Sequence, residues 1–129
     1  MKRLSQAVFA FTILWLSSGL VPAAETAPFT PAAFEAAQKA GKPILIDISA
    51  TWCTTCKAQA LILNKLFSEP KFEELPVFDI DVDSQKDAMR TFGAKDRATL
   101  IVFKGSQEVG RSMFDTNRDS IEALLTKGL

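Results

Sequence analysis

The stretch PILIDISATWCTTCKA, residues 43–58, places an apolar run directly before a tryptophan and the only two cysteines of the chain. The run KPILIDIS (42–49) is apolar and too short for a helix, so it predicts a buried strand. From Cys53 to Phe67 nothing interrupts a helix, and Pro70 ends it. The cysteine pair therefore lies just past the carboxyl end of a strand, where open α/β sheets place their chemistry.

The rest of the chain continues this alternation of strands and helices. Strands that are separated by helices imply right-handed parallel crossovers, and a closing hairpin adds an antiparallel edge. The sequence therefore predicts an α/β fold, with a central mixed sheet of about four strands and helices on both faces. We expect the further helices over 31–40, 84–92 and 116–127, strands over 76–82 and 98–103, and the returning hairpin arm over 107–114.

The first 24 residues differ in composition from the rest. Lys2 and Arg3 precede an apolar run at 7–16, and small residues at 21–24 offer a cleavage site, which are the three parts of a secretory signal peptide. The alternative is an uncleaved membrane anchor, although the apolar run is short of the roughly 20 residues that a spanning helix needs. We expect a periplasmic or secreted protein, membrane-anchored if uncleaved, with a signal peptide over 1–24, a linker over 25–29 and one domain over 30–129.

Composition excludes several classes of function. The 129 residues carry 15 basic and 15 acidic side chains, so no polybasic surface indicates nucleic-acid binding. Histidine is absent, which rules out Ser–His and Cys–His pairs and histidine ligation of a metal within this chain. Without Lys2 and Arg3 the counts become 13 basic and 15 acidic, a net charge of −2.

We expect a monomer that needs no cofactor and no metal.

The spacing of Cys53 and Cys56 favours redox chemistry. Residues three apart share one face of a helix, which puts the two sulfurs within bonding reach. The unpaired N–H groups and the dipole at a helix start favour the thiolate, the reactive form of cysteine. Cys53 is then the nucleophile that exchanges with a partner's disulfide, and Cys56 is the thiol that resolves the mixed disulfide.

Two structural alternatives remain for the pair. A disulfide that closes so short a loop removes little entropy from the unfolded chain, so it is a weak structural staple. Half of a zinc site would need two more ligands, from carboxylates or a second subunit, because the chain has no other cysteine or histidine.

Three neighbours of the cysteines are candidate functional residues. Asp47 interrupts a strand that should be covered on both faces. A buried carboxyl group near Cys56 could accept the proton of the Cys56 thiol. The alternative is an aspartate that reaches water or pairs with a lysine. Lys57 either favours the thiolate or pairs with Asp47, or it is simply solvated. Trp52 either forms a flat apolar surface for partners or packs in front of the helix.

These residues carry a resemblance to a known family. PILIDISATWCTTCKA resembles the strand, buried aspartate, W-C-x-x-C and following lysine of the thioredoxin superfamily, and ATLIVFKGSQEVGR (98–111) resembles its penultimate hairpin. The likeness covers about residues 30–128. The segment LFSEPKFEELPVFDIDV (66–82) is similar to the C-terminal thioredoxin-like domain of the periplasmic reductase DsbD.

The resemblance implies a thioredoxin-like fold and disulfide exchange with protein thiols and disulfides, with a membrane protein as a possible electron donor. It implies a nucleophilic Cys53, a resolving Cys56 and a proton-handling Asp47. The family normally has a cis-proline before the Thr-Leu of its hairpin, where this chain has Ala98. A cis bond before a non-proline residue costs about 2.5–4 kcal/mol, so we expect a trans Arg97–Ala98 bond and an altered substrate loop. In that loop Arg97 either favours the thiolate or points into solvent.

Two functions follow. The first is an exported protein disulfide oxidoreductase that works as a reductant, whose partners bind over Trp52, Arg97, Ala98 and Thr99. The second is a non-catalytic thioredoxin-like module that binds a partner or a metal, for which Ala98 is the best support.

Overall fold

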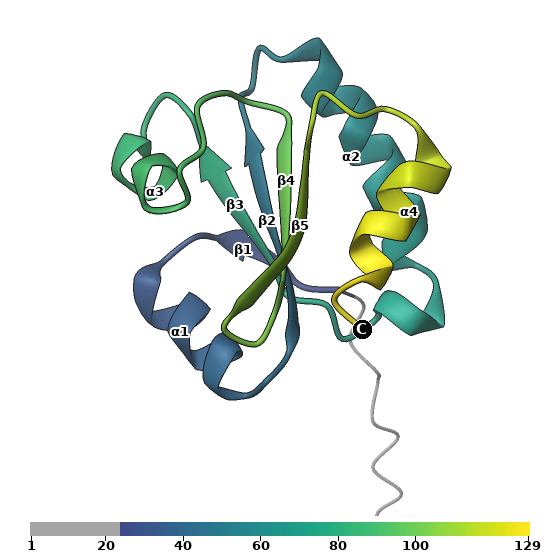
Figure 1. The fold of residues 1–129 in the computed structure, drawn as a ribbon. Coiled ribbons are helices and arrows are strands. Elements are labelled where there is room, and N and C mark those ends of the chain that lie inside the picture. Colours follow the sequence, from purple (N-terminus) through teal and green to yellow (C-terminus); the bar gives the residue numbers. More distant parts are fainter. Residues whose placement is uncertain (1–23) are drawn as a thin grey trace, which may run out of the picture.

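The computed structural model describes residues 24–129. The predicted signal peptide lies outside the described residues, except for Ala24. From α1 onward, the helices and strands follow the expected order along the chain (Figure 1). They are β1 (Thr26–Pro28), α1 (Pro31–Lys39), β2 (Pro43–Ser49), α2 (Thr54–Phe67), the 3-10 turn η1 (Pro70–Phe72), β3 (Val77–Asp81), α3 (Lys86–Thr91), β4 (Thr99–Lys104), β5 (Gln107–Met113) and α4 (Arg118–Thr126).

The strands form one mixed sheet in the order β1-β3-β2-β4-β5. β2 pairs in parallel with β3, which is reached through the crossover helix α2, and antiparallel with β4. β4 and β5 form the expected hairpin, whose turn uses Gly105 at φ +57°, a conformation that costs glycine little. The predicted α/β class, with a mixed sheet and helices on both faces, is confirmed.

The sheet has a fifth strand where the sequence predicts a linker. Residues 26–28 pair in parallel with the outer edge of β3, and the Phe29 N–H donates to the Asp79 carbonyl oxygen at 2.8 Å. Phe29 then enters the core, where it is 7% exposed. An edge strand of three exposed residues has no alternating pattern, and Pro28 is tolerated because an edge strand need not donate on both sides. The linker interpretation of 25–29 is therefore wrong for this segment.

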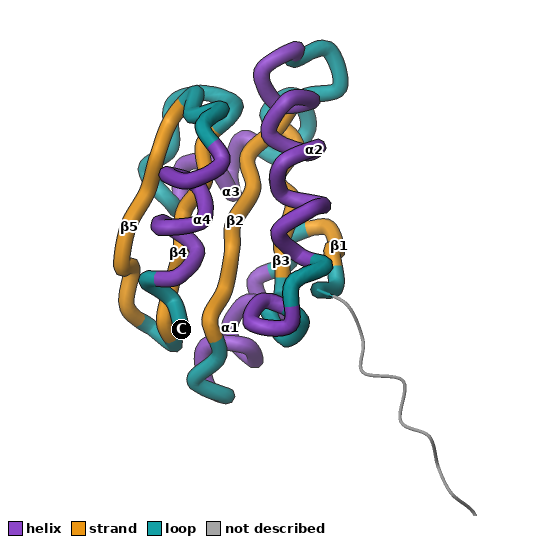
Figure 2. Tube along the Cα trace, turned by 90° about the vertical axis from the view of Figure 1, so that its right-hand side faces the viewer, coloured by secondary structure: helices purple, strands orange, loops and turns teal. Residues whose placement is uncertain are grey.

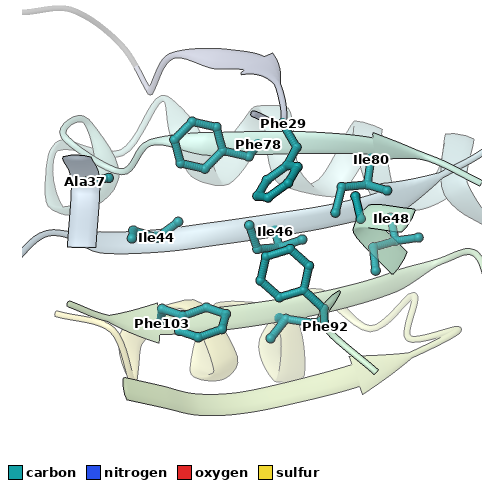
Figure 3. Packing of buried hydrophobic residues seen from close by; sticks show 11 residues of the cluster. Phe29, Ala37, Ile44, Ile46, Ile48, Phe78, Ile80, Phe92 and Phe103 are labelled. Atoms are coloured by element: carbon teal, nitrogen blue, oxygen red, sulfur yellow. The ribbon is translucent and has the colours of Figure 1, made fainter. Parts of the chain in front are cut away.

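Two apolar cores lie on opposite faces of the sheet. Helices α1 and α3 cover one face and α2 and α4 the other, as the side view shows (Figure 2). The α1/α3 core is rich in phenylalanine, with ring centroids 5.2–6.4 Å apart and mostly edge-to-face (Figure 3). The alternation of β2 sends Ile44, Ile46 and Ile48 into this core and Leu45 into the other.

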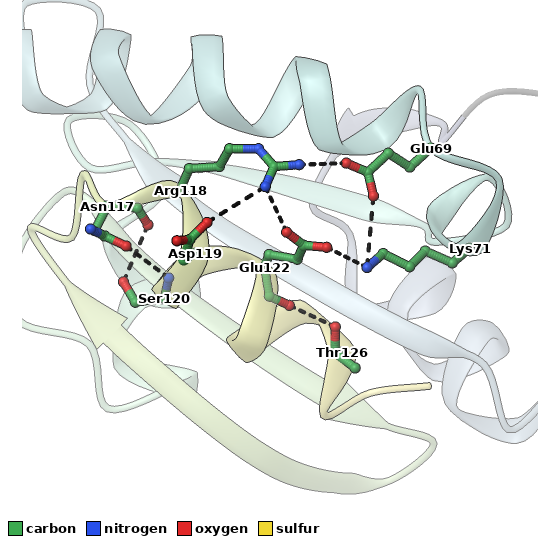
Figure 4. A network of polar contacts seen from close by, with 8 residues as sticks. All are labelled: Glu69, Lys71, Asn117, Arg118, Asp119, Ser120, Glu122 and Thr126. Atoms are coloured by element: carbon green, nitrogen blue, oxygen red, sulfur yellow. Dashed lines mark hydrogen bonds and ion pairs between the residues drawn. The ribbon is translucent and has the colours of Figure 1, made fainter.

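An ion-pair network fastens α4 to the end of α2. Arg118 contacts Glu122 at 2.8 Å and Glu69 at 2.6 Å, and Lys71 binds Glu122 (Figure 4). These groups are partly exposed, so solvent screens the pairs and each adds little to stability. The network lies at the carboxyl end of α2, away from the cysteines at its other end. Among residues 24–129, no helix has the length and apolar character to cross a membrane.

Candidate active site

Cys53 and Cys56 lie at the junction of β2 and α2 and are joined by a disulfide, with their Cα atoms 5.2 Å apart. Cys53 is the N-cap of α2, with extended backbone angles (φ −86°, ψ 109°). Its sulfur accepts the backbone N–H of Cys56 at 3.1 Å, the contact that an N-cap side chain makes with the first turn. A negative charge on the Cys53 sulfur would therefore face unpaired N–H groups at the positive end of the helix dipole.

Both cysteines are covered, Cys53 at 2% and Cys56 at 7% exposure. They form a small cluster with Ala50 and Ala98, against which Val82 packs. Ala98 belongs to the loop before β4, and its bond to Arg97 is trans, as expected. Its φ of +54° lies in the left-handed region, which costs an alanine about 1–2 kcal/mol. The backbone of Ala98 is thus strained where its methyl group packs against the disulfide. Backbone strain of this kind is common at functional sites.

Hydrogen bonds from two distant residues hold Ala98 in this conformation. Its carbonyl oxygen accepts the Phe114 N–H at 2.8 Å and the side-chain amide of Gln59 at 3.2 Å. The same Gln59 nitrogen donates to the Asp115 carbonyl oxygen at 2.8 Å. Gln59, 1% exposed on α2, therefore ties the cysteine helix to both loops beside the disulfide. Gln59 was not predicted from the sequence, where its only signal is a polar residue on the inward face of an amphipathic helix.

Asp47 lies on β2 beside a second carboxylate, Asp79, which was not predicted from the sequence as part of the site. In the parallel register Asp47 is paired with Asp79 on β3, and both side chains share the face that Leu45 and Val77 direct toward α2. A cleft of about 370 Å³ is lined by Asp47, Asp79, Cys56 and Lys57. Asp47 and the resolving cysteine thus face one space, whereas Cys53 does not line it.

Burial and the neighbouring Asp79 raise the pKa of Asp47 from 3.8 to about 7. Burial also raises the pKa of Asp79. Within residues 24–129, neither carboxylate pairs with a cation, and Lys57 forms no ion pair although it lines the same cleft. The Lys57–Asp47 pair considered from the sequence is therefore absent. Asp47 can hold or release a proton near neutral pH, the property that a general acid or base needs.

Trp52 and Arg97 form an exposed surface next to the disulfide. Trp52 is 57% exposed, and its indole N–H donates to Asp83 at 2.9 Å. The Arg97 guanidinium stacks 4.9 Å from the Trp52 ring and 5.6 Å from the ring of Phe114, and it binds Asp96 at 2.8 Å. Arg97 thus stacks on aromatic rings, where the sequence left a choice between the cysteines and solvent.

Thr99 differs from Trp52 in its exposure. It is 2% exposed, and its hydroxyl donates to the Asp96 carbonyl oxygen at 2.8 Å, so its side chain is turned into the loop. Ala98 is also fully buried. Of the residues expected to meet a partner, only Trp52 and Arg97 present side chains at the surface. In the part of the chain described, no three carboxylate or cysteine side chains gather in a way that could hold a metal ion.

Comparisons with known proteins agree with this geometry. The thioredoxin family model matches residues 25–127. Thioredoxin of Alicyclobacillus acidocaldarius is 32% identical over 100 residues, which cover 78% of this chain and 94% of that protein. Thioredoxin of Mycobacterium tuberculosis is 40% identical over 70 residues, 54% of this chain and 60% of that protein.

A solved structure gives the same result in three dimensions. The crystal structure of Trxlp from Edwardsiella tarda aligns with a TM-score of 0.76 and 38% identity, over 78% of this chain and 98% of that one. The disulfide at the start of α2, the strand and helix that flank it, and these relatives support thiol–disulfide oxidoreductase activity. This chain is a member of the thioredoxin family.

Proposed function

We propose that this protein is an exported reductant that transfers electrons from the Cys53–Cys56 dithiol to disulfides of partner proteins. The observation that carries the proposal is the division of labour between the sulfurs: Cys53 caps the helix, while Cys56 shares a cleft with Asp47. Export rests on the composition of residues 1–24. The reducing direction, with a membrane dithiol as electron donor, rests on the likeness of 66–82 to the DsbD domain.

The reaction runs in two exchanges. The Cys53 thiolate attacks one sulfur of the partner disulfide, the partner S–S bond breaks, and one partner sulfur leaves as a thiolate that takes a proton from water. Asp47, ionised, accepts the Cys56 proton, directly or through water in the shared cleft. The Cys56 thiolate then attacks the Cys53 sulfur, the mixed disulfide breaks, and the second partner sulfur leaves as a thiolate that takes up a proton from Asp47 or from water, which returns Asp47 to its ionised form. Two electrons reach the partner, and the Cys53–Cys56 disulfide must be reduced again by the donor.

Trp52 and Arg97 shape access to the reacting sulfur. Because Cys53 is only 2% exposed, a partner has to approach over the surface formed by Trp52 and Arg97 and displace side-chain cover at the disulfide. A partner with a flexible segment around its cysteine meets this requirement, since an extended chain can follow the surface without a clash with the domain.

A trapping experiment with Cys56→Ser tests the proposal. The reduced variant keeps Cys53 but has no resolving thiol, so incubation with insulin, a protein with accessible disulfides, should leave a mixed disulfide visible on a non-reducing gel. The Cys53→Ser/Cys56→Ser variant is the matched control and should leave none. If Cys56→Ser gives no more adduct than this control, the exchange mechanism is wrong. That result would instead support the alternative of a non-catalytic binding module.

The direction is read from the wild type in the same system. Reduced wild type should reduce insulin until its own dithiol is consumed. Oxidised wild type should form disulfides in a reduced protein far more slowly. The opposite order of these two rates would contradict the reductant assignment and leave the exchange mechanism intact.

A further inference from the structure

A second hollow, of about 330 Å³, begins at the active-site surface and extends over α3. Its lining includes six large side chains, Trp52, Lys86, Met89, Arg90, Lys95 and Arg97. We call these six residues the basic groove. Helix α3 lies near the end of the sheet at which α2 begins (Figure 1), and Val82, which packs on the cysteine cluster, also borders the groove. The groove is therefore continuous with the surroundings of the disulfide.

The charge of the groove is opposite to that of the domain. Residues 24–129 carry 13 basic and 15 acidic side chains, a net charge of −2, because Lys2 and Arg3 are the charged residues of the first 23. The groove presents four cations, and the one carboxylate in its lining is Asp96. Asp96 is already neutralised by Arg97, whose backbone N–H and guanidinium both donate to it and lower its pKa.

Two of the cations have no acidic partner within the described residues. Arg90 pairs with Asp87 and Arg97 with Asp96, whereas no ion pair involves Lys86 or Lys95. Both lysines are exposed. Asp83 is not part of the groove lining, and it accepts the Trp52 indole N–H at 2.9 Å. The groove thus combines an aromatic and apolar floor, from Trp52 and Met89, with two exposed ammonium groups that are free to bind carboxylates.

A substrate attached to Cys53 lies next to this groove. Trp52 directly precedes Cys53, and Arg97 directly precedes Ala98, which packs on the disulfide. In an extended chain each residue advances about 3.3 Å, so side chains two to five positions from the partner's cysteine can reach the groove.

We propose that the basic groove selects protein substrates that carry glutamate or aspartate within about five residues of the reactive cysteine. This inference rests on the proposed function and names the substrate class of the same site. The carboxylates would pair with Lys86 and Lys95 at the rim of the interface. Rim charges act mainly by steering encounter and by excluding partners of the wrong sign, and salt weakens both effects.

The test uses three disulfide peptides of identical length that differ only at two positions, two and four residues from the cysteine, where they carry Glu, Gln or Lys at both. Reduction by the full domain, recycled with dithiothreitol, is measured as kcat/KM in 20 mM and in 500 mM salt. An exposed pair is worth about threefold, so the two lysines should favour the Glu peptide over the Gln peptide by about tenfold in low salt and disfavour the Lys peptide. In high salt the preference should fall to about twofold or less.

Two variants assign the preference to the groove. Lys86→Gln/Lys95→Gln should bring the Glu-to-Gln ratio close to one, and Lys86→Glu/Lys95→Glu should reverse it in favour of the Lys peptide. Lys39→Gln/Lys65→Gln changes the net charge equally at the carboxyl-terminal ends of α1 and α2, and it should keep the wild-type ratio. Urea denaturation midpoints confirm that each variant is folded.

The outcomes separate the two proposals. Equal reduction of the three peptides by the wild type overturns the groove proposal and leaves the reductase in place. A preference that survives Lys86→Glu/Lys95→Glu unchanged also overturns it. If none of the peptides is reduced, the proposed function fails, and the substrate class falls with it.

Discussion

Replacing Cys53 with serine is expected to reduce the catalysed reduction of insulin at least about a thousandfold, to the background given by dithiothreitol alone. The serine hydroxyl is not ionised at neutral pH, and it has no sulfur with which to form the mixed disulfide. The first exchange therefore has no nucleophile. The loss can be attributed to chemistry because serine is a good N-cap residue. It can accept the Cys56 N–H as the Cys53 sulfur does, so α2 should still begin at the same place.

Insulin turbidity in dithiothreitol measures this effect. The unfolding midpoint of Cys53→Ser should stay close to that of reduced wild type, because neither protein has the disulfide and serine can cap α2 in place of Cys53. A variant that is folded and keeps more than about a tenth of the wild-type rate would show that Cys53 is not the attacking group.

The second large effect is the dependence of stability on pH through Asp47. In the folded chain the pKa of Asp47 is about 7, against 3.8 for the ordinary group. Between these pH values the folded state binds more protons than the unfolded state. The free energy of unfolding therefore falls as the pH rises through this interval. From pH 5 to pH 8 the expected loss due to Asp47 is on the order of 2–3 kcal/mol.

Urea denaturation of oxidised wild type and Asp47→Asn at pH 5 and pH 8 isolates this contribution. The chain has no histidine, so few other groups titrate in this range, and the difference between the two proteins reports mainly on Asp47. Asp47→Asn should gain stability relative to wild type as the pH rises. Asp119→Asn, which removes an exposed carboxylate from α4, should follow wild type at both pH values. Parallel behaviour of wild type and Asp47→Asn would show that the Asp47 carboxyl is not desolvated.

Much of the fold follows from local pattern. The run 43–49, the uninterrupted helix after Cys53 and the hairpin turn at Gly105 each have one conformation that suits their residues, and their order leaves few topologies. Strand β1 was missed for a physical reason. Its three exposed residues are held by backbone pairing with β3, and a side-chain pattern carries no information about which edge is free.

The site was predictable where it depends on sequence neighbours and not where it depends on register. Cys53, Cys56 and Trp52 are adjacent in the chain, so their proximity needed no tertiary information. Asp79 meets Asp47 only because β2 and β3 pair in one particular register, which the sequence does not reveal. Likewise, the stacking of Arg97 on Trp52 depends on how two loops from distant parts of the chain approach each other.

The central claim is that the start of α2 holds the Cys53 sulfur as a thiolate at neutral pH. Thiolate absorbance at 240 nm measures this in reduced Cys56→Ser, whose single thiol is Cys53, and the absence of tyrosine leaves the signal free of tyrosinate. We predict that more than half of the thiolate absorbance is present at pH 7.5, as for cysteines at other helix starts. If the absorbance instead appeared only around pH 8.5, as for an ordinary free cysteine, the mechanism would be contradicted.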